Sequence, residues 1–409
     1  MRILSPKKKR KSGKIIRKST ETYFNDRLLD MRVLIYWHCF FLPETKYLIE
    51  ALAKQPLISE LILVGPKAHS TDELPPKCYR VPSLPFRPKW CGLRTFYSLI
   101  KKEKPDRILI IDEPLSWNVL AAGLAAKLSH SRSQVFFYAF ENLYHGIPWN
   151  LIYKRPLVFL MKAFRFFCFD RLLLPIRKKC ITAGLVSSVE CQEVLLKYKW
   201  DLKTQKHPWP IDLKVFQKEA PLTEIAARRE GLRILDHIKV IGYVGRFVPE
   251  KGIFDLLQAF LHFEEDTHLL FIGEGPLRAK MEAFIEENKL SKKISLIGQV
   301  DSQELTVWYQ VMDVLVLPSR TQFFWKEQYG RVLIEAMAAK CRVVGSDSGA
   351  IPSIIGNARF IFKEGNSQDM AAKIQEALHS LEEENITQYF SKIAAQANIK
   401  SFVQALLTL

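Results

Sequence analysis

The sequence predicts an α/β protein of two domains, each built on a doubly wound parallel sheet. The chain has 409 residues, more than one hydrophobic core usually serves, and 48% of them are apolar, enough to fill two cores. Short apolar segments alternate with helical stretches, which is typical of right-handed crossovers between parallel strands. This alternation occurs once in each half of the chain, so each half is expected to form its own sheet.

The first half starts its pattern at Met31, where a buried strand is expected at MRVLIYW. Further strands are expected at ELILVG, DRILIID and QVFFYAF, and the pattern continues through RLLLP and GLVSSVECQEVLLKYKW. The prolines of HPWPIDLKVF end regular structure, and a linker with one charged helix follows near residues 216–237. We therefore expect the first domain to span residues 31–220.

The second half repeats the theme over residues 221–385, and six strands are expected there. They are KVIGYVGR, HLLFIGEG, ISLIGQV, VLVLPSR, CRVVGSD and RFIF. Ligands of open α/β sheets bind where loops leave the carboxyl ends of the strands, so the residues just after each strand carry the most information about function.

Charge is distributed unevenly. The formal net charge is +17 at pH 7, with 10 basic and 3 acidic residues in 1–30, 29 and 16 in 31–220, and 21 and 24 in 221–409. The basic character thus belongs to the N-terminal half. It indicates either an ordinary solvated surface or an anionic partner such as a lipid headgroup layer, a phosphorylated acceptor or nucleic acid.

Residues 1–30 are expected to form a basic, disordered tail. Their PKKKRK string has the form of a nuclear-import or nucleic-acid patch, but a mis-assigned start codon or a membrane-attracted tail is favoured. The tail has no apolar segment or cleavage site, so export is not expected. The longest apolar stretch, residues 156–174, contains four charged residues and is not expected to span a membrane.

The seven cysteines are scattered and contain no C-x-x-C pair. This usage suits reduced thiols in a cytosol, so we expect a cytoplasmic protein. It gives no support for zinc, because structural zinc sites need closely spaced ligand pairs.

The strongest local signals for a ligand site follow two strands of the second half. Gly245, Arg246, Lys251 and Gly252 follow KVIGYV, where glycines let the backbone approach an anion and two cations can neutralise a diphosphate, although surface cations are often only solvated. A second turn contains Gly273, Glu274, Gly275 and Pro276, and it either leaves room for a ligand or is an ordinary tight turn.

The segment EQYGRVLIE contains two glutamates, Glu327 and Glu335, separated by seven residues. A helix is expected to start at Gly330 and Arg331 and to run to Lys340. Its free N–H groups make an anion site. Glu327 could then hold a hexose and Glu335 a ribose diol, because carboxylates accept hydrogen bonds from hydroxyl groups. Acidic residues near helix starts also occur for dipole reasons alone.

Together these motifs resemble the retaining GT-B glycosyltransferases of family 4, also called glycosyl transferases group 1. The resemblance covers the C-terminal half nearly continuously, through GRFVPEKG, FIGEGPLRAKME, LIGQV, VLPS, EQYGRVLIE, EAMA and VVGSDSGAIPSIIG. It is looser in the N-terminal half. The family implies two Rossmann-like domains facing a central cleft, with residues 386–409 as a helix that packs back on the first domain.

Carried over to this chain, the resemblance implies that Arg246 and Lys251 grip the diphosphate of a nucleotide-sugar donor, that Glu327 contacts its sugar and that Glu335 holds its ribose. Val300 is expected to pack against the base.

The resemblance also implies that the backbone of Tyr329, Gly330 and Arg331 meets phosphate or sugar, and Gly245 and Gly275 are expected to border the donor. No metal or other cofactor is expected, because the two cations and the helix start act in its place.

The chain departs from the family at three places. The first strand is followed by YWHCFFLPE, which has no glycine, so a phosphate contact from this domain is uncertain. After QVFFYAF, where a histidine often stands, any of Glu141, Asn142 and His145 could face the reacting carbon. Lys340 and Cys341 stand where the family commonly has Gly and Pro.

The resemblance thus implies transfer of a hexose-type sugar to a glycan or lipid-linked acceptor in cell-envelope synthesis. The aromatic and basic stretch at residues 147–169 is either a buried helix or an interfacial segment that attaches to the inner face of an anionic membrane. A nucleotide-sugar 2-epimerase on the same scaffold is an alternative, and a nucleic-acid-binding protein is a remote one.

Overall fold

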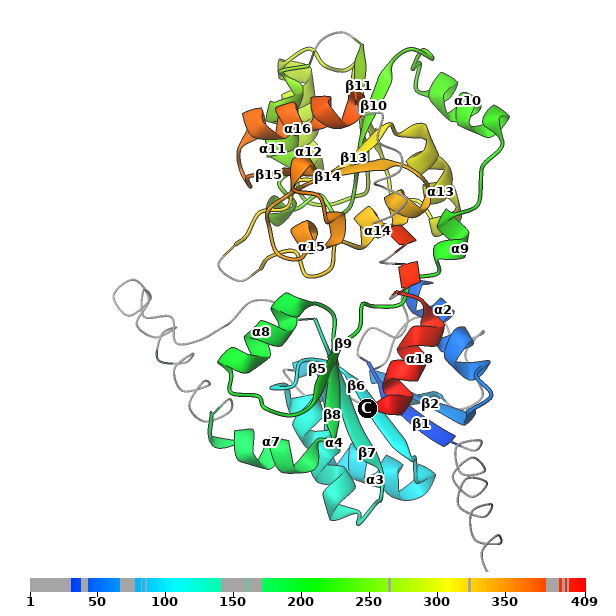
Figure 1. Ribbon diagram of the computed structural model, residues 1–409, viewed down its shortest axis with the longest axis vertical. Coiled ribbons are helices and arrows are strands. Elements are labelled where there is room, and N and C mark those ends of the chain that lie inside the picture. The colour runs from blue at the N-terminus through cyan, green and yellow to red at the C-terminus, as the bar shows by residue number, and fades with distance from the viewer. Residues whose placement is uncertain are drawn as a thin grey trace, which may run out of the picture.

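The computed structural model describes residues 31–37, 43–66, 78–81, 83–84, 87–140, 160, 171–263, 266–322, 325–379, 390–391, 394–395 and 397–409. They form two α/β domains, one above the other in Figure 1. The predicted tail, the candidates Glu141, Asn142 and His145, and all of the stretch 147–169 except Leu160 lie outside the described residues.

The N-terminal domain contains a parallel sheet of seven described strands in the order β3-β2-β1-β6-β7-β8-β9. The strands are β1 (Met31–Tyr36), β2 (Ile58–Pro66), β3 (Cys78–Val81), β6 (Arg107–Ile111), β7 (Gln134–Ala139), β8 (Ala183–Val186) and β9 (Thr204–Lys206). A small antiparallel pair, β4 (Ser83–Leu84) and β5 (Arg87–Cys91), lies beside this sheet. Chain order reverses between β1 and β6, as in a doubly wound sheet.

Helices cover both faces of this sheet because its strands are apolar on both sides. The helices are α2 (Pro43–Ala53), α3 (Leu93–Glu103), α4 (Trp117–Leu128), α7 (Leu174–Cys180), α8 (Val189–Lys197) and α18 (Ile399–Thr408). Alternate residues of β1 belong to two different hydrophobic clusters. Leu34 shares a cluster with residues of α3, α4, α7 and α8, whereas Val33 and Ile35 share one with residues of α2 and the C-terminal α18.

The C-terminal domain contains a parallel sheet of six described strands in the order β12-β11-β10-β13-β14-β15. They are β10 (Lys239–Val244), β11 (Thr267–Ile272), β12 (Ile294–Ile297), β13 (Val314–Leu317), β14 (Arg342–Ser346) and β15 (Ile361–Phe362). These are the six strands predicted from the sequence, and chain order reverses between β10 and β13. The predicted α/β fold with two Rossmann-like domains is therefore confirmed.

Helical segments pack around this second sheet. They are α11 (Ile253–Phe260), α12 (Arg278–Glu287), α13 (Ser302–Val311), α14 (Arg331–Ala338), α15 (Ile351–Ile355), α16 (Ser367–His379), and the short 3₁₀ turns η2 (Pro249–Lys251) and η3 (Ala358–Phe360). Two further helices, α9 (Leu213–Phe216) and α10 (Leu222–Gly231), connect the domains in sequence, so the linker is largely helical.

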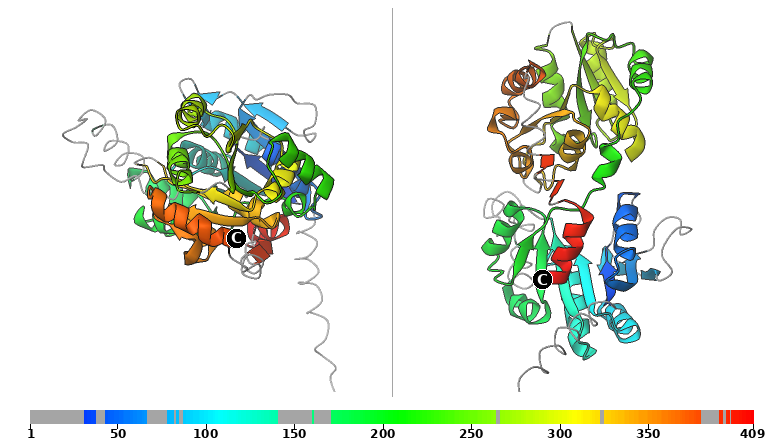
Figure 2. Two further views of the ribbon diagram at one scale, coloured as in Figure 1. Left: turned by 90° about the horizontal axis from the view of Figure 1, so that it is seen from above. Right: turned by 45° about the vertical axis from the view of Figure 1, so that its right-hand side comes forward.

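The C-terminal helix α18 lies against the N-terminal sheet, as Figure 1 and the right-hand view of Figure 2 show. The Arg107 guanidinium donates to the carbonyls of Leu406 and Leu407. His207 Nε2 is 3.0 Å from Ser401 Oγ. The chain thus ends on the domain in which its first strand lies.

Three local expectations were wrong. RLLLP is not a strand, because the chain turns there and α7 begins at Leu174 with a proline in its first turn. The last helix is not continuous: Asn398 caps α18, and its side chain accepts from Ser401 N. Helix α14 ends at Ala338 and does not reach Lys340, because Lys340 has a left-handed backbone conformation with a φ of 63°. Glycine adopts this conformation most easily, which explains why a glycine suits this position.

No helix among the described residues has the length and apolar character that crossing a bilayer requires.

Candidate functional site

A cavity of about 430 Å³ opens at the carboxyl edge of the C-terminal sheet. It lies where the chain leaves β10 and β11, beside the first turns of α13 and α14. The lining residues are Val244, Gly245, Arg246, Ile272, Gly273, Glu274, Gln299, Val300, Ser302, Leu305, Arg331, Val332 and Glu335. Five of the predicted site residues, Gly245, Arg246, Val300, Arg331 and Glu335, therefore border one space.

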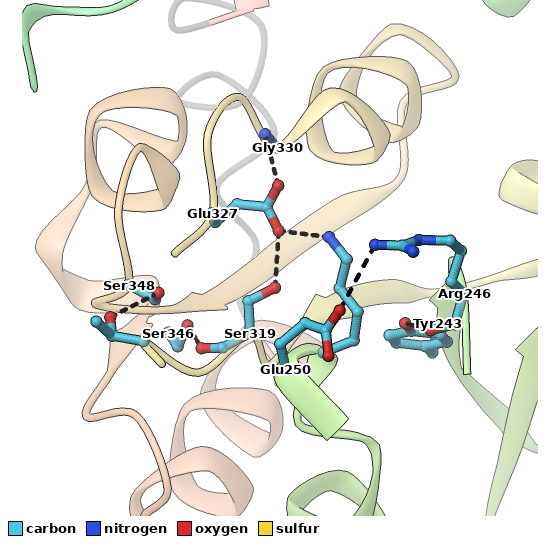
Figure 3. A network of polar contacts seen from close by, with 10 residues as sticks. Tyr243, Arg246, Glu250, Ser319, Glu327, Gly330, Ser346 and Ser348 are labelled. Atoms are coloured by element: carbon cyan, nitrogen blue, oxygen red, sulfur yellow. Dashed lines mark hydrogen bonds and ion pairs between the residues drawn. The ribbon is translucent and has the colours of Figure 1, made fainter. Parts of the chain in front are cut away.

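Arg246 is the cation that follows β10. Its side chain is 68% exposed, and its guanidinium lies 3.6 Å from the Glu250 carboxylate, toward which it points in Figure 3. The Tyr243 hydroxyl donates to the Arg246 carbonyl over 2.9 Å and so fixes the turn. The backbone of Arg246 is thus fixed by a hydrogen bond, and the exposed guanidinium at the end of its side chain can reach a ligand.

Lys251 ends the turn η2, and the next residue, Gly252, makes this position possible. Gly252 has a φ of 65°, and a Cβ atom there would lie 1.8 Å from the Pro318 carbonyl oxygen at the end of β13. Only glycine allows that approach. The Lys251 ammonium consequently reaches the loop before α14, where its Nζ lies 2.6 Å from Glu327 Oε2.

Glu327 is 7% exposed and is held by several donors. The Ser319 hydroxyl donates to Oε2 over 2.8 Å, and the Gly330 N–H donates to Oε1 over 3.4 Å (Figure 3). Burial opposes ionisation of this carboxyl, but the Lys251 ammonium and these donors outweigh burial and hold its pKa below the ordinary value. Glu327 is therefore an ionised carboxylate in a fixed orientation.

Glu335 lies in the second turn of α14 and is 3% exposed. The Tyr309 hydroxyl donates to Oε2 over 2.9 Å, and Arg331 Nε donates to Oε1 over 2.5 Å. Burial, reinforced by the Glu335 charge, raises the pKa of Tyr309, so Tyr309 stays a donor. Each carboxylate oxygen has more than one lone pair and can still accept from a ligand hydroxyl.

The remaining predicted residues do not line this cavity. Lys251 and Glu327 form their ion pair beside it, at the end of β13. Gly275 lies against the backbone of Phe247, where a Cβ atom would come within 2.5 Å of the Phe247 carbonyl oxygen. Tyr329 is buried, and its hydroxyl donates to the Trp209 carbonyl over 2.8 Å. Gly330 caps α14 with a φ of 62°.

Sequence reasoning missed four residues of this site: Glu250, Tyr309, Ser319 and Trp325. Ser319 and Glu250 stand in loops that follow strands, so position alone offered a weak signal. Tyr309 contacts Glu335 from the last turn of α13, and nothing local in the sequence indicates this contact. Among the described residues, no group of three or more His, Cys, Asp or Glu side chains is arranged to hold a metal ion.

Comparison with known proteins covers this same region. Residues 225–395 match the model of the family described as glycosyl transferases group 1. This match covers the C-terminal domain, which contains the cavity.

Two curated relatives each match part of the chain. The putative teichuronic acid biosynthesis glycosyltransferase TuaC of Bacillus subtilis is 30% identical over 173 residues, which are 42% of this chain and 41% of TuaC. The alpha-monoglucosyldiacylglycerol synthase of Acholeplasma laidlawii is 29% identical over 164 residues, 39% of this chain and 40% of that protein. The chain thus spans about two fifths of the length of these relatives.

Similarity to solved structures extends over both domains. HepE of Anabaena in complex with UDP superposes with a TM-score of 0.67 at 14% identity, covering 93% of this chain and all of HepE. At this identity the likeness establishes the fold, and the GT-B arrangement of two Rossmann-like domains is shared.

Proposed function

We propose that the chain is a glycosyltransferase that moves a hexose-type sugar from a nucleotide diphosphate sugar to a glycan or lipid-linked acceptor, with retention of anomeric configuration. The observation that carries the proposal is the cavity at the reversal of the second sheet, which Arg246, Arg331 and Glu335 border together. Such a cavity offers cations for a diphosphate and a carboxylate for a ribose diol.

The donor would lie along the carboxyl edge of this sheet. Val300 and Glu335 both border the cavity, and in this proposal the base packs against Val300 while Glu335 accepts from the ribose hydroxyls. The diphosphate meets Arg246, Lys251 and the opening N–H groups of α14, whose partial positive charge favours an anion. The sugar then reaches Glu327, which the Lys251 ammonium and the Ser319 hydroxyl orient.

In the proposed mechanism the bond between the anomeric carbon and the diphosphate oxygen breaks while the acceptor oxygen bonds to the same face of that carbon. The departing oxygen takes the acceptor proton. Negative charge therefore grows on the diphosphate in the transition state, where Arg246 and Lys251 stabilise it. In this proposal no metal is required, so transfer should persist when EDTA removes divalent cations.

For the acceptor we propose a glycan or lipid-linked molecule at the cytoplasmic face of an anionic membrane, in cell-envelope synthesis. TuaC and the alpha-monoglucosyldiacylglycerol synthase are named for envelope and lipid products. The excess of basic residues in 31–220 gives the N-terminal domain a charge that suits such a surface. This domain also exposes large apolar side chains, among them Leu172, Ile176 and Leu196.

A panel of nucleoside diphosphates tests the donor proposal. Binding to the folded state raises the thermal midpoint by mass action, so one of UDP, GDP and ADP should raise it above the value without ligand. No shift with any of the three would contradict the proposal. The matching nucleotide sugars should then be consumed only when an acceptor is present. Consumption without an acceptor, with inversion at C2 of the sugar, would favour the epimerase.

Liposomes test the proposed membrane surface. At low salt the protein should sediment with vesicles that contain anionic lipid and not with neutral vesicles, because the attraction is electrostatic. Failure to bind anionic vesicles would contradict this part of the proposal. Deletion of residues 1–30 should leave donor turnover intact, whereas a nucleic-acid-binding function would depend on these lysines.

A further inference from the structure

Trp325 lies beside the ion pair of Lys251 and Glu327, although the family motif implies no role for it. The Lys251 Nζ atom lies 4.8 Å from the centre of the Trp325 ring, over its face. The same Nζ atom is 2.6 Å from Glu327 Oε2. One ammonium group thus meets a carboxylate and an aromatic face together.

The backbone fixes the position of the Trp325 ring. Gln322 N donates to the Trp325 carbonyl over 2.6 Å, and Trp325 N donates to the Gln322 carbonyl over 3.3 Å. This antiparallel bridge lies between Ser319, which orients Glu327, and Glu327 itself. Trp325 is half-buried, and its ring lies against the Lys251 ammonium that pairs with Glu327.

The two contacts of the Lys251 ammonium differ in how many of its N–H donors they use. An ammonium group has three N–H donors. Glu327 accepts one of them, whereas an aromatic face attracts the positive charge through its quadrupole without requiring a directed N–H bond. Among the described residues, Glu327 is the acceptor that Lys251 contacts, so its remaining donors stay available for phosphate oxygens.

The aromatic face also limits where the ammonium can go. A lysine side chain is a flexible four-carbon stem, and an ion pair with one carboxylate oxygen leaves it free to rotate about that contact. The Lys251 side chain is only 15% exposed, so the contact with the ring is largely shielded from water and correspondingly strong. A preorganised charge acts on a transition state without a reorganisation cost.

We propose that Trp325 is a positioning residue that holds the Lys251 ammonium over its ring and directs the free N–H groups of that ammonium toward the donor diphosphate. This inference rests on the proposed function, because it requires the donor phosphates to lie beside Lys251. It predicts an effect on diphosphate binding and on kcat that passes through Lys251.

A double-mutant cycle tests the inference. The probe is whichever of UDP, GDP and ADP gives the wild-type protein the largest thermal shift, and the control ligand is its nucleoside. Trp325→Leu removes the aromatic face and should weaken diphosphate binding about tenfold, whereas Trp325→Phe keeps a ring and should weaken it less, about threefold. Affinity for the nucleoside should not change. In a Lys251→Met background, Trp325→Leu should change diphosphate affinity less than about twofold.

Two results would overturn the inference while leaving the proposed function intact. One is unchanged diphosphate affinity and kcat in Trp325→Leu. The other is an equal loss with Lys251 present and absent, which would mean that Trp325 touches the donor directly or serves the fold alone. A wild-type protein that binds none of the three diphosphates would instead overturn the proposed function. Thermal midpoints of all variants control for folding, and Trp325→Met replaces Trp325→Leu if that variant does not fold.

Discussion

The two domains share one architecture but differ in the side chains at the carboxyl edges of their sheets. In the C-terminal domain this edge carries ionised groups in pairs, such as Lys251 with Glu327 and Arg331 with Glu335. At the corresponding edge of the N-terminal domain, the described residues after β1 and β7 are aromatic. The same arrangement of strands thus supports two different surfaces.

The aromatic edge is a cluster around Trp209, in the segment that leads from β9 toward the second domain. The Trp209 ring lies 5.1 Å from that of Trp37, 5.2 Å from that of Tyr138 and 5.4 Å from that of Phe140. Phe402 of α18 packs against Trp209 and Tyr138. These aromatic residues are therefore held by contacts between their rings, beside Glu113 after β6, whose carboxylate accepts from Phe140 N, whereas the C-terminal edge carries ion pairs.

This difference teaches that the fold supplies the frame and the strand ends supply the chemistry. Charged groups at the second edge are oriented by their neighbours, as the proposed binding of a diphosphate requires. We expect the aromatic groups at the first edge to stabilise the joint between the domains, where the Tyr329 hydroxyl donates to the Trp209 carbonyl. Substitutions at the two edges should therefore affect stability and activity separately.

The largest effect is expected from the aromatic edge. Trp209→Ala removes a buried ring that four others contact, and it should lower the free energy of unfolding by about 3–5 kcal/mol. Urea denaturation followed by circular dichroism measures this change. Trp209→Phe is the matched control and should lose less. A loss below about 1 kcal/mol in Trp209→Ala would mean that the cluster does not stabilise the joint.

The charged edge should show its effect in catalysis. Lys251→Ala should lower kcat on the order of 10²-fold or more, the scale of losing one preorganised donor to a transition state. Steady-state kinetics with the preferred nucleotide sugar measure it. Lys280→Ala, at an exposed position of α12, should leave kcat at the wild-type value. An unchanged kcat in Lys251→Ala would remove this residue from the mechanism.

Acid should weaken the C-terminal domain through His268, a buried residue of β11. Burial, with a smaller contribution from the Arg229 charge, lowers its pKa from 6.5 to about 4. The unfolded chain then binds the proton more tightly than the folded one. The free energy of unfolding should therefore fall as pH drops from about 6.5 to about 4, by on the order of 2 kcal/mol after solvent screening.

The difference between wild type and His268→Gln isolates this contribution, since the variant keeps a polar group near Ser295, the hydrogen-bond partner of His268. Between pH 6.5 and 4 the denaturation midpoint of the wild type should fall more steeply than that of the variant. Parallel pH profiles for the two proteins would contradict the assignment.

The smallest effect is expected from the hydrogen bond that joins the two edges. The Tyr329 hydroxyl, two residues beyond Glu327, donates to the carbonyl of Trp209. Tyr329→Phe removes that hydrogen bond and leaves a buried carbonyl without this donor, so stability should fall by about 1 kcal/mol. Thermal denaturation measures it, with kcat measured beside it. A fall in kcat larger than that in Lys251→Ala would mean that this joint, rather than the ion pair, limits transfer.

The sequence predicts the C-terminal sheet well because its strands are uninterrupted apolar runs followed by glycine or charge. The sequence also predicts those cavity residues that stand shortly after a strand, such as Arg246 after β10 and Val300 after β12. RLLLP was wrongly predicted to be a strand, because a short apolar run fits a strand and the start of a helix equally well. The partners of the two glutamates, Ser319 and Tyr309, come from elements distant in sequence, and only the packed structure brings them into contact.

The central claim is that a nucleoside diphosphate binds at the charged edge, with its phosphates beside Arg246, Lys251 and the start of α14. A crystal structure of the protein with the diphosphate that gives the largest thermal shift tests this claim most directly. The account predicts phosphate oxygens within hydrogen-bond distance of both cations and the ribose hydroxyls at Glu335. A nucleotide bound at the aromatic edge of the N-terminal domain, with the charged edge empty, would contradict it.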